Sequence, residues 1–143
     1  MKSERQELVL DQKIKLEQIL TELDEAKERL IRLDEMKNSG KIERQSVYDR
    51  LKGEYTEKYE NCKTEIQEEG IRSTQWIQLL NREARTLEDA LESTKVRVEL
   101  GELSETEAET LKKEKEQRLN KCKSCALVLD SLVTDVRSKG VQI

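Results

Sequence analysis

Apolar residues recur along the first third of the chain at alternating intervals of three and four residues. The members of this series are Val9, Leu16, Ile19, Leu23, Ala26, Leu30 and Leu33, with one interval of seven after Val9. Such spacing is the heptad repeat of helices that pack side by side in a coiled coil. Four further apolar residues lie off this line: Leu10, Ile14, Leu20 and Ile31. A stripe this wide predicts packing against more than one neighbouring helix.

Two glycines interrupt the helical pattern, each followed by one residue and then an aliphatic one. Gly40 precedes Ile42, and Gly101 precedes Leu103. A glycine in the left-handed conformation ends a helix at low steric cost, so both stretches predict a helical hairpin corner. After the second glycine, Ser104 and Glu107 have the spacing of a capping box, with Leu103 and Ala108 as its hydrophobic staple.

The first corner allows the same staple between Ile42 and Val47, with Glu43 at the cap position. Two corners divide the chain into three helices, predicted at about residues 4–38, 45–99 and 104–138. We therefore expect an all-α fold: one elongated domain, residues 1–143, in which three antiparallel coiled-coil helices are joined by Gly-x-Ile/Leu corners. At about 1.5 Å per residue the middle helix would be about 80 Å long, with Gly70 as the expected place for a bend.

The apolar seam continues through the second and third helices. In the second helix it comprises Tyr48, Leu51, Tyr55, Tyr59, Cys62, Ile66, Trp76, Leu80, Ala84, Leu87, Leu91 and Val98. In the third helix it comprises Ala108, Leu111, Leu119, Cys122, Ala126, Leu129, Val133 and Val136. Two-helix ribbons bury too little apolar surface to offset chain entropy, so a dimer or higher homo-oligomer is expected.

Composition supports helices and argues against several classes of function. Of the 143 residues, 41% are charged and 3% aromatic, with no Pro and 5 Gly, which favours long amphipathic helices over a thick globular core. The 31 acidic and 27 basic residues are interleaved, unlike the basic stripe of a nucleic-acid-binding protein. No apolar run approaches the roughly 18 residues that span a bilayer, and the polar N-terminus is unlike a signal peptide. A cytoplasmic location is the expectation.

No residue pattern indicates catalysis, a cofactor or a metal. The chain has no His, no Gly-rich phosphate loop and no nucleophile motif. Cys122 and Cys125 have the C-x-x-C spacing of redox sites and zinc knuckles, but they lie within a helical pattern and lack two further ligands. Packing in the seam is the favoured interpretation, and a site shared between two chains is the alternative.

Aromatic and charged stretches offer candidate contact surfaces. Tyr48, Tyr55 and Tyr59 share a helical face, where packing is favoured over binding, and Trp76 suits either role. Residues 111–123 contain six basic and two acidic residues, a composition that suits contact with anionic lipid or DNA phosphate, although a solvated face is the favoured interpretation. Residues 99–109 contain five glutamates and no basic residue, which suits a helix N-terminus and offers an electrostatic partner to a neighbouring molecule; a solvated face is the favoured interpretation here too.

The order of these features resembles the coiled-coil domain of the archaeal cell-division protein CdvA. The likeness rests on "LDEMKNSGKIERQSVYDRL" and "VELGELSETEAETL", which are similar to the recurring Leu-x-x-Gly-Lys-Ile-Ser-x-x-x-Tyr corners of that family. The second corner departs from it, with Glu109 and Lys115 in place of the expected Tyr. The resemblance implies a polymerising scaffold at the membrane, with ESCRT-III-like subunits and the membrane surface as partners during division.

Two other classes of function fit the sequence. A helical adaptor would bind a different protein and would remain a monomer or dimer. A thiol or metal switch built on Cys122 and Cys125 would change its assembly on oxidation or on addition of zinc. The self-associating scaffold, without enzymatic turnover, is the preferred interpretation.

Overall fold

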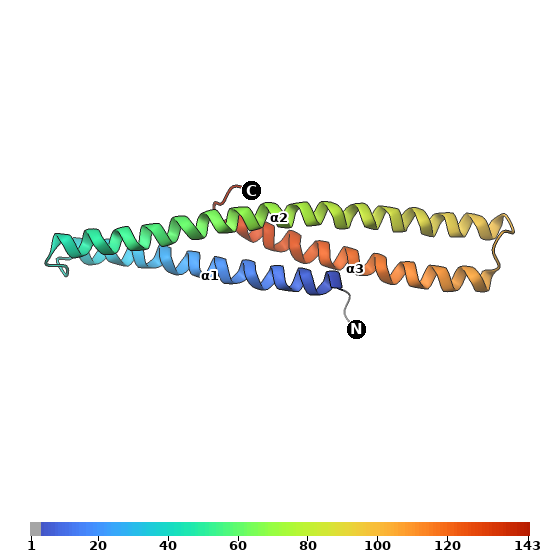
Figure 1. The fold of residues 1–143 in the computed structure, drawn as a ribbon, viewed down its shortest axis with the longest axis horizontal. Helices are drawn as coiled ribbons and strands as arrows, with labels where there is room; N and C mark the ends of the chain where they lie inside the picture. Colours follow the sequence, from blue (N-terminus) through green and yellow to red (C-terminus); the bar gives the residue numbers. More distant parts are fainter. Residues whose placement is uncertain (1–3) are drawn as a thin grey trace. The chain divides into compact units, whose positions relative to one another are not determined.

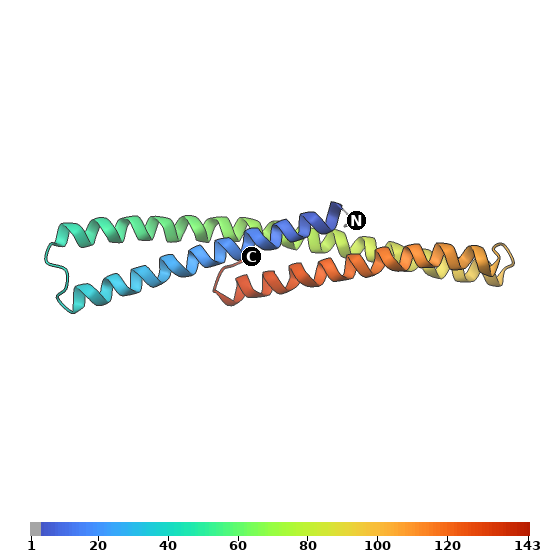
Figure 2. The ribbon, with the colours of Figure 1, turned by 90° about the horizontal axis from the view of Figure 1, so that it is seen from below.

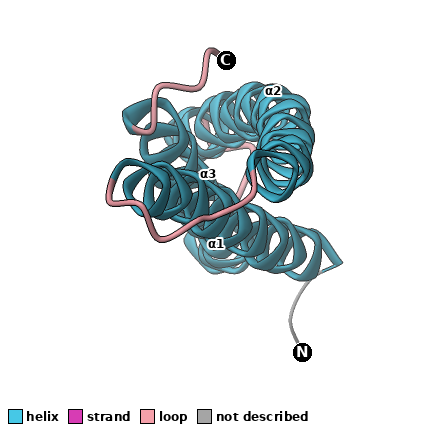
Figure 3. Ribbon diagram, turned by 90° about the vertical axis from the view of Figure 1, so that its left-hand side faces the viewer, coloured by secondary structure: helices cyan, strands magenta, loops and turns pink. Residues whose placement is uncertain are grey.

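The computed structural model describes residues 4–143, and all of their regular secondary structure is helical (Figures 1 and 3). The helices are α1 (Glu4–Asn38), α2 (Gln45–Glu99) and α3 (Glu105–Ser138). They pack against one another, and no strand occurs between residues 4 and 143. The predicted all-α class is confirmed.

The chain packs as two compact units, each containing part of every helix. The Gly40 unit consists of Gln12–Ile71 and Leu132–Ile143. Among the described residues, the Gly101 unit consists of Arg72–Ser131 and residues 4–11. The largest fully buried side chains are divided between them: Leu16, Ile66, Val133 and Val136 in the Gly40 unit, and Leu129 and Ser73 in the Gly101 unit.

In the Gly40 unit α1 and α2 lie side by side (Figure 2), and the hydrogen bonds between them follow a regular order. Asp34 is hydrogen-bonded to Tyr48, Glu22 to Cys62, and Gln12 to Glu69. The residue number on α1 falls as that on α2 rises. Beyond α3, the Lys139 ammonium lies 3.1 Å from the Asp24 carboxylate of α1.

Both predicted turn glycines adopt the left-handed conformation, with φ of 75° at Gly40 and 79° at Gly101. Lys41 N donates to Met36 O at 2.9 Å and Gly40 N to Lys37 O at 3.1 Å. The second turn repeats this pair of hydrogen bonds: Glu102 N donates to Arg97 O at 2.9 Å, and Gly101 N donates to Val98 O at 3.1 Å. This is the Schellman motif, which satisfies the last carbonyls of a helix and requires a residue that tolerates positive φ. The same local chemistry therefore ends α1 and α2.

The starts of α2 and α3 differ. Before α3, Glu107 N donates to Ser104 Oγ at 3.1 Å, the hydrogen bond of a serine N-cap. Before α2, the expected cap at Glu43 is wrong, because Arg44 is the residue that directly precedes the helix. The Arg44 carbonyl accepts hydrogen bonds from Val47 N at 3.1 Å and Tyr48 N at 3.4 Å. This position holds none of the usual capping residues Ser, Thr, Asp or Asn. The sequence after Gly40 therefore carries no signal that marks the first residue of α2.

Gly70 makes room for the end of the chain. The helix α2 continues through it without a break. A Cβ placed on Gly70 would overlap the Cδ1 atom of Ile143 and lie 3.0 Å from its Cγ1 atom. The residues after α3 thus turn back within the Gly40 unit, where Val141 is buried and Ile143 half-buried (Figure 1).

We expect Gly53→Ala to raise the free energy of unfolding by about 1 kcal/mol, because Ala is the better helix former and nothing lies near the new methyl group. Gly70→Ala should raise the free energy of unfolding by less than Gly53→Ala does, or should lower it, because the Ile143 side chain must move to make room for the new methyl group. In an Ile143→Ala background, Gly70→Ala should recover the full gain. Urea unfolding of the four variants followed by circular dichroism measures this difference, and an equal effect of Gly70→Ala in both backgrounds would contradict the packing of Ile143 on Gly70.

Candidate functional site

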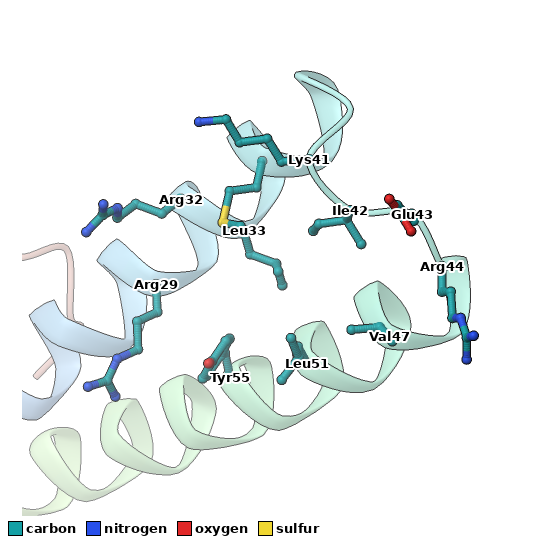
Figure 4. Close-up of a pocket in the computed structure, with 11 residues that line it drawn as sticks. Arg29, Arg32, Leu33, Lys41, Ile42, Glu43, Arg44, Val47, Leu51 and Tyr55 are labelled. Carbon is teal, nitrogen blue, oxygen red and sulfur yellow. The ribbon is translucent and has the colours of Figure 1, made fainter.

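A hollow of about 550 Å³ opens at the Gly40 turn, between the end of α1 and the start of α2 (Figure 4). Its apolar lining consists of Leu33, Met36, Ile42, Val47, Leu51 and Tyr55. Its charged lining consists of Arg29, Arg32, Lys41, Glu43 and Arg44. We call this surface the Gly40 hollow. It combines an apolar floor with four basic side chains and one acidic side chain around it.

Local sequence explains why the Gly40 hollow stays open. Leu33 belongs to the seam and is buried, whereas Ile42 lies in the turn and is only half-buried. The turn separates the ends of α1 and α2, so the apolar side chains of Met36 and Val47 remain exposed at 43% and 36%. The basic side chains keep their charges in water along the edge. This arrangement suits a ligand that carries both an apolar group and negative charge.

The Gly101 turn presents the opposite charge. Leu100 is 69% exposed and Val96 46% exposed at the end of α2. They lie in a shallow depression of about 460 Å³ with Asp89, Glu92, Ser93, Arg97 and Glu102. Arg97 lies 3.9 Å from the Glu102 carboxylate, so part of its charge is already balanced. We call these seven residues the Gly101 surface; it carries three carboxylates, one arginine and an exposed leucine.

A hydrogen-bonded network centred on Tyr48 lies beside the Gly40 hollow. The Tyr48 hydroxyl donates to Asp34 Oδ1 at 2.5 Å and accepts from Lys52 Nζ at 2.9 Å. The Lys37 ammonium lies 4.0 Å from the centre of the Tyr48 ring, a cation–π distance. The hydrogen bond from Tyr48 lowers the pKa of Asp34, and Lys52 lowers it further. The bond to Tyr48 and the charge of Asp34 raise the pKa of Lys52.

This network should stabilise the fold between two pH limits. The lowered pKa of Asp34 adds stability above the carboxyl's ordinary value of 3.8, and that stability is lost as pH falls through the folded-state pKa. The raised pKa of Lys52 adds stability that is lost as pH rises above 10.5. In Tyr48→Phe, both pKa values should move back toward their ordinary values. NMR titration of the Asp34 carboxyl carbon measures this, with Tyr59→Phe as a control; an unchanged Asp34 pKa in Tyr48→Phe would contradict the network.

A buried polar layer in the Gly40 unit is a feature that sequence reasoning missed. Gln12 Nε2 donates to Glu69 Oε2 at 2.9 Å and to the Glu69 carbonyl at 3.3 Å. Lys15 Nζ lies 3.0 Å from Glu69 Oε1. Both Gln12 and Glu69 are 6% exposed. Gln12 occupies the seam position inside the interval between Val9 and Leu16, so that interval of seven was the available signal.

The other predicted seam residues differ in burial. The buried ones are Val9, Leu16, Ile19, Leu23, Ala26, Leu33, Tyr48, Cys62, Ile66, Leu80, Ala84, Leu87, Leu119, Cys122, Ala126, Leu129, Val133 and Val136. The half-buried ones are Leu30, Leu51, Tyr55, Tyr59, Trp76, Leu91, Val98 and Ala108. Leu111 is 38% exposed. The turn residues Gly40, Gly101, Ser104 and Glu107 are exposed, and Ile42 and Leu103 are half-buried. Whether partner chains cover the exposed positions stays a prediction.

Trp76 contributes to a second apolar hollow, of about 700 Å³, within the Gly101 unit. Its lining is Leu8, Val9, Trp76, Leu79, Leu80, Glu83, Thr86, Leu87 and Arg118. Leu8 and Leu79 are 48% and 60% exposed. Arg118 Nη2 donates to Glu83 Oε1 at 3.4 Å across this hollow. The space is therefore apolar with one ion pair, and it suits the apolar face of a helix.

The cysteines are buried thiols at Cys62, Cys122 and Cys125. Burial raises the pKa of the Cys62 thiol, and the neighbouring carboxylates of Glu22 and Glu65 raise it further. Burial also raises the pKa of Cys125. A raised pKa disfavours the reactive thiolate. Within residues 4–143, no three His, Cys, Asp or Glu side chains gather where they could hold a metal ion.

No protein-family model matches the chain, and neither a curated protein nor a solved structure matches it. The resemblance to CdvA therefore stays a prediction. None of the helices formed by residues 4–143 combines the length and the apolar composition needed to cross a bilayer.

Proposed function

We propose that the chain is a non-enzymatic scaffold whose copies associate with one another. The observation that carries this proposal is that apolar side chains outside the seam remain exposed to solvent on the helices. Five exposed side chains off the buried seam illustrate it: Ile14 and Ile31 on α1, Ile71 and Leu79 on α2, and Leu127 on α3, each at least 45% exposed. Single exposed apolar residues are ordinary, but here they recur along all three helices. A second copy would remove them from water.

The finer architecture belongs to the same proposal. In it, the chain is an antiparallel coiled coil whose corners are the Gly40 and Gly101 turns. Support comes from the contact order between α1 and α2, in which Asp34 is bonded to Tyr48 and Gln12 to Glu69. Along two antiparallel helices, the residue numbers of the contacting partners rise on one helix as they fall on the other. Support also comes from the identical Schellman bonds at the two glycines.

The resemblance to the CdvA coiled-coil domain supplies the biological setting of the proposal. In that setting the scaffold assembles at a membrane and positions ESCRT-III-like filaments during archaeal division. The basic stretch at residues 111–123, whose Lys112, Lys113 and Lys121 are exposed, is the candidate contact with anionic lipid. Assembly of identical units, without chemical turnover, is the mechanism.

High-speed sedimentation over a range of protein concentrations tests the scaffold, together with electron microscopy of the pellet. A scaffold predicts a critical concentration above which the pelleted fraction grows and ordered polymers appear. Protein that stays in the supernatant at all concentrations would overturn this proposal. Vesicles containing anionic lipid, compared with neutral ones, test the membrane contact separately.

An adaptor for another protein is the second candidate, and the hollow at Trp76 favours it. The exposed Leu8 and Leu79 beside Trp76 offer the surface that an amphipathic helix of a different protein would fill. An adaptor predicts a monomer or a fixed dimer. Leu79→Asp should then abolish binding of the partner while the mass of the free protein stays unchanged.

A thiol or metal switch at Cys122 and Cys125 is the third candidate, but both thiols are buried, and burial raises the pKa of Cys125, which disfavours the reactive thiolate. The double variant Cys122→Ser, Cys125→Ser tests it. If this variant assembles like the unmodified protein with and without oxidant or zinc, the switch is excluded.

A further inference from the structure

We propose that the Gly101 surface of one copy docks into the Gly40 hollow of a second copy, with the Leu100 side chain entering the hollow. This inference rests on the proposed self-association and adds a contact between two turn surfaces to the exposed apolar residues along the helices. Each surface lies wholly within one unit, so the pairing depends only on the local structure of each turn.

Apolar complementarity is the first step. Leu100, which directly follows α2, is 69% exposed, and Val96 lies four residues before it in the last turn of that helix. The Gly40 hollow, of about 550 Å³, exposes Met36 and Val47 to water. Docking would place Leu100 against Ile42 and Leu51 and would remove exposed apolar surface from both copies.

Charge complementarity identifies the occupant as a second copy. The hollow is lined by Arg29, Arg32, Lys41 and Arg44 against the single acid Glu43. The Gly101 surface carries Asp89, Glu92 and Glu102 against one arginine, and residues 99–109 add no basic group. Opposite potentials steer the two different surfaces together, and like potentials oppose hollow-to-hollow pairing.

Pairing of two different surfaces has a consequence for assembly. Each copy that docks through its Gly101 surface still offers its own Gly40 hollow. Such heterologous contacts extend from copy to copy, into a ring if the rotation closes and into an open polymer if it does not. A self-complementary contact would stop at a dimer.

Two charge-reversal variants of the full chain test the pairing. The hollow variant is Arg29→Glu, Arg32→Glu, Lys41→Glu, and the surface variant is Asp89→Lys, Glu92→Lys, Glu102→Lys. Each variant alone carries like charges on both surfaces, so its apparent dissociation constant for self-association should rise at least tenfold. An equimolar mixture of the two variants should restore growth, by which we mean the rise of the assemblies' mass with protein concentration. In the mixture each hollow again meets a surface of opposite charge. Light scattering at low ionic strength measures all three samples.

Matched controls separate docking from general charge effects and from misfolding. Arg50→Glu, Lys58→Glu, Lys63→Glu changes the net charge as the hollow variant does, at exposed positions of α2 outside the hollow, and should leave growth unchanged. Leu100→Ser should also weaken association, because it removes the side chain that enters the hollow while the charges of both surfaces stay unchanged. Equal helical content and melting temperature of all variants show that each one folds.

The outcomes are distinct. Loss of growth in each variant alone and recovery in the mixture support the pairing. If both variants grow like the unmodified protein, the pairing is wrong while self-association stands. If each variant loses growth but the mixture does not recover, the two surfaces do not meet each other and the pairing is again wrong. If the unmodified protein never grows, the proposed function fails as well.

Discussion

Replacing Leu16 by alanine should lower the free energy of unfolding by about 2 to 5 kcal/mol, the largest single effect we expect. Leu16 is fully buried in the Gly40 unit, and alanine would remove buried methyl groups and leave a cavity. Urea unfolding followed by circular dichroism at 222 nm measures the change.

Ile14→Ala is the matched control for Leu16→Ala. Ile14 lies two residues away on α1 and is 62% exposed, so its truncation should cost less than about 0.5 kcal/mol in a single chain. Equal losses for the two variants at low protein concentration would contradict the placement of the α1 seam. A loss at Ile14 that appears only at high concentration would show that a second copy covers it.

Gln12→Leu should be the second largest effect, a loss of about 1.5 to 3 kcal/mol, because Glu69 would keep a buried carboxylate without its amide donor. The Gln12 amide lies 2.9 Å from the Glu69 carboxylate, and both side chains are 6% exposed. The Lys15 ammonium, 3.0 Å from Glu69, still balances the charge, but it lies at Oε1, the carboxylate oxygen that Gln12 does not contact. Chemical denaturation of the variant gives the loss directly.

The double variant Gln12→Leu, Glu69→Leu completes a double-mutant cycle. Removing both partners takes away the desolvated carboxylate, so the double variant should recover much of the loss or exceed the original stability. Single polar positions in a seam fix register and partner choice at a cost in stability, and we expect the double variant to associate less specifically. Additive losses in the cycle would contradict a coupled polar layer.

Much of the helical architecture could be predicted from residue spacing. Heptads mark which face of α1 is buried, because apolar residues at intervals of three and four share one side of a helix. Gly40 and Gly101 mark the helix ends, since each requires positive φ. Ser104 marks the start of α3 through its side-chain oxygen, whereas Arg44 gives no comparable signal at the start of α2.

The polar layer and the two surfaces could not be predicted in the same way. Gln12 and Glu69 are 57 positions apart in the sequence, and only folding brings them together. Likewise, Gly70 has the composition signal of a helix break, but its neighbour Ile143 comes from beyond α3. The Gly40 hollow depends on how far the turn separates Leu33 from Val47, a tertiary distance that spacing along the chain does not contain.

Seam spacing predicts that helices associate far better than it predicts with which partner. The charges at the two turns narrow that choice, because Arg29 and Arg32 at one turn complement Asp89 and Glu92 at the other. The proposed docking of the Gly101 surface into the Gly40 hollow should therefore weaken as ionic strength rises. The reason is that the Debye length shortens from about 10 Å at 0.1 M toward about 3 Å at 1 M.

Light scattering coupled to size-exclusion chromatography, with reductant present and over a hundredfold range of protein concentration, tests self-association most directly. A scaffold whose copies pair through two different surfaces predicts a mass that rises with concentration beyond that of a dimer, and a smaller mass at high salt. A mass that stays at 16.7 kDa at every concentration would contradict it.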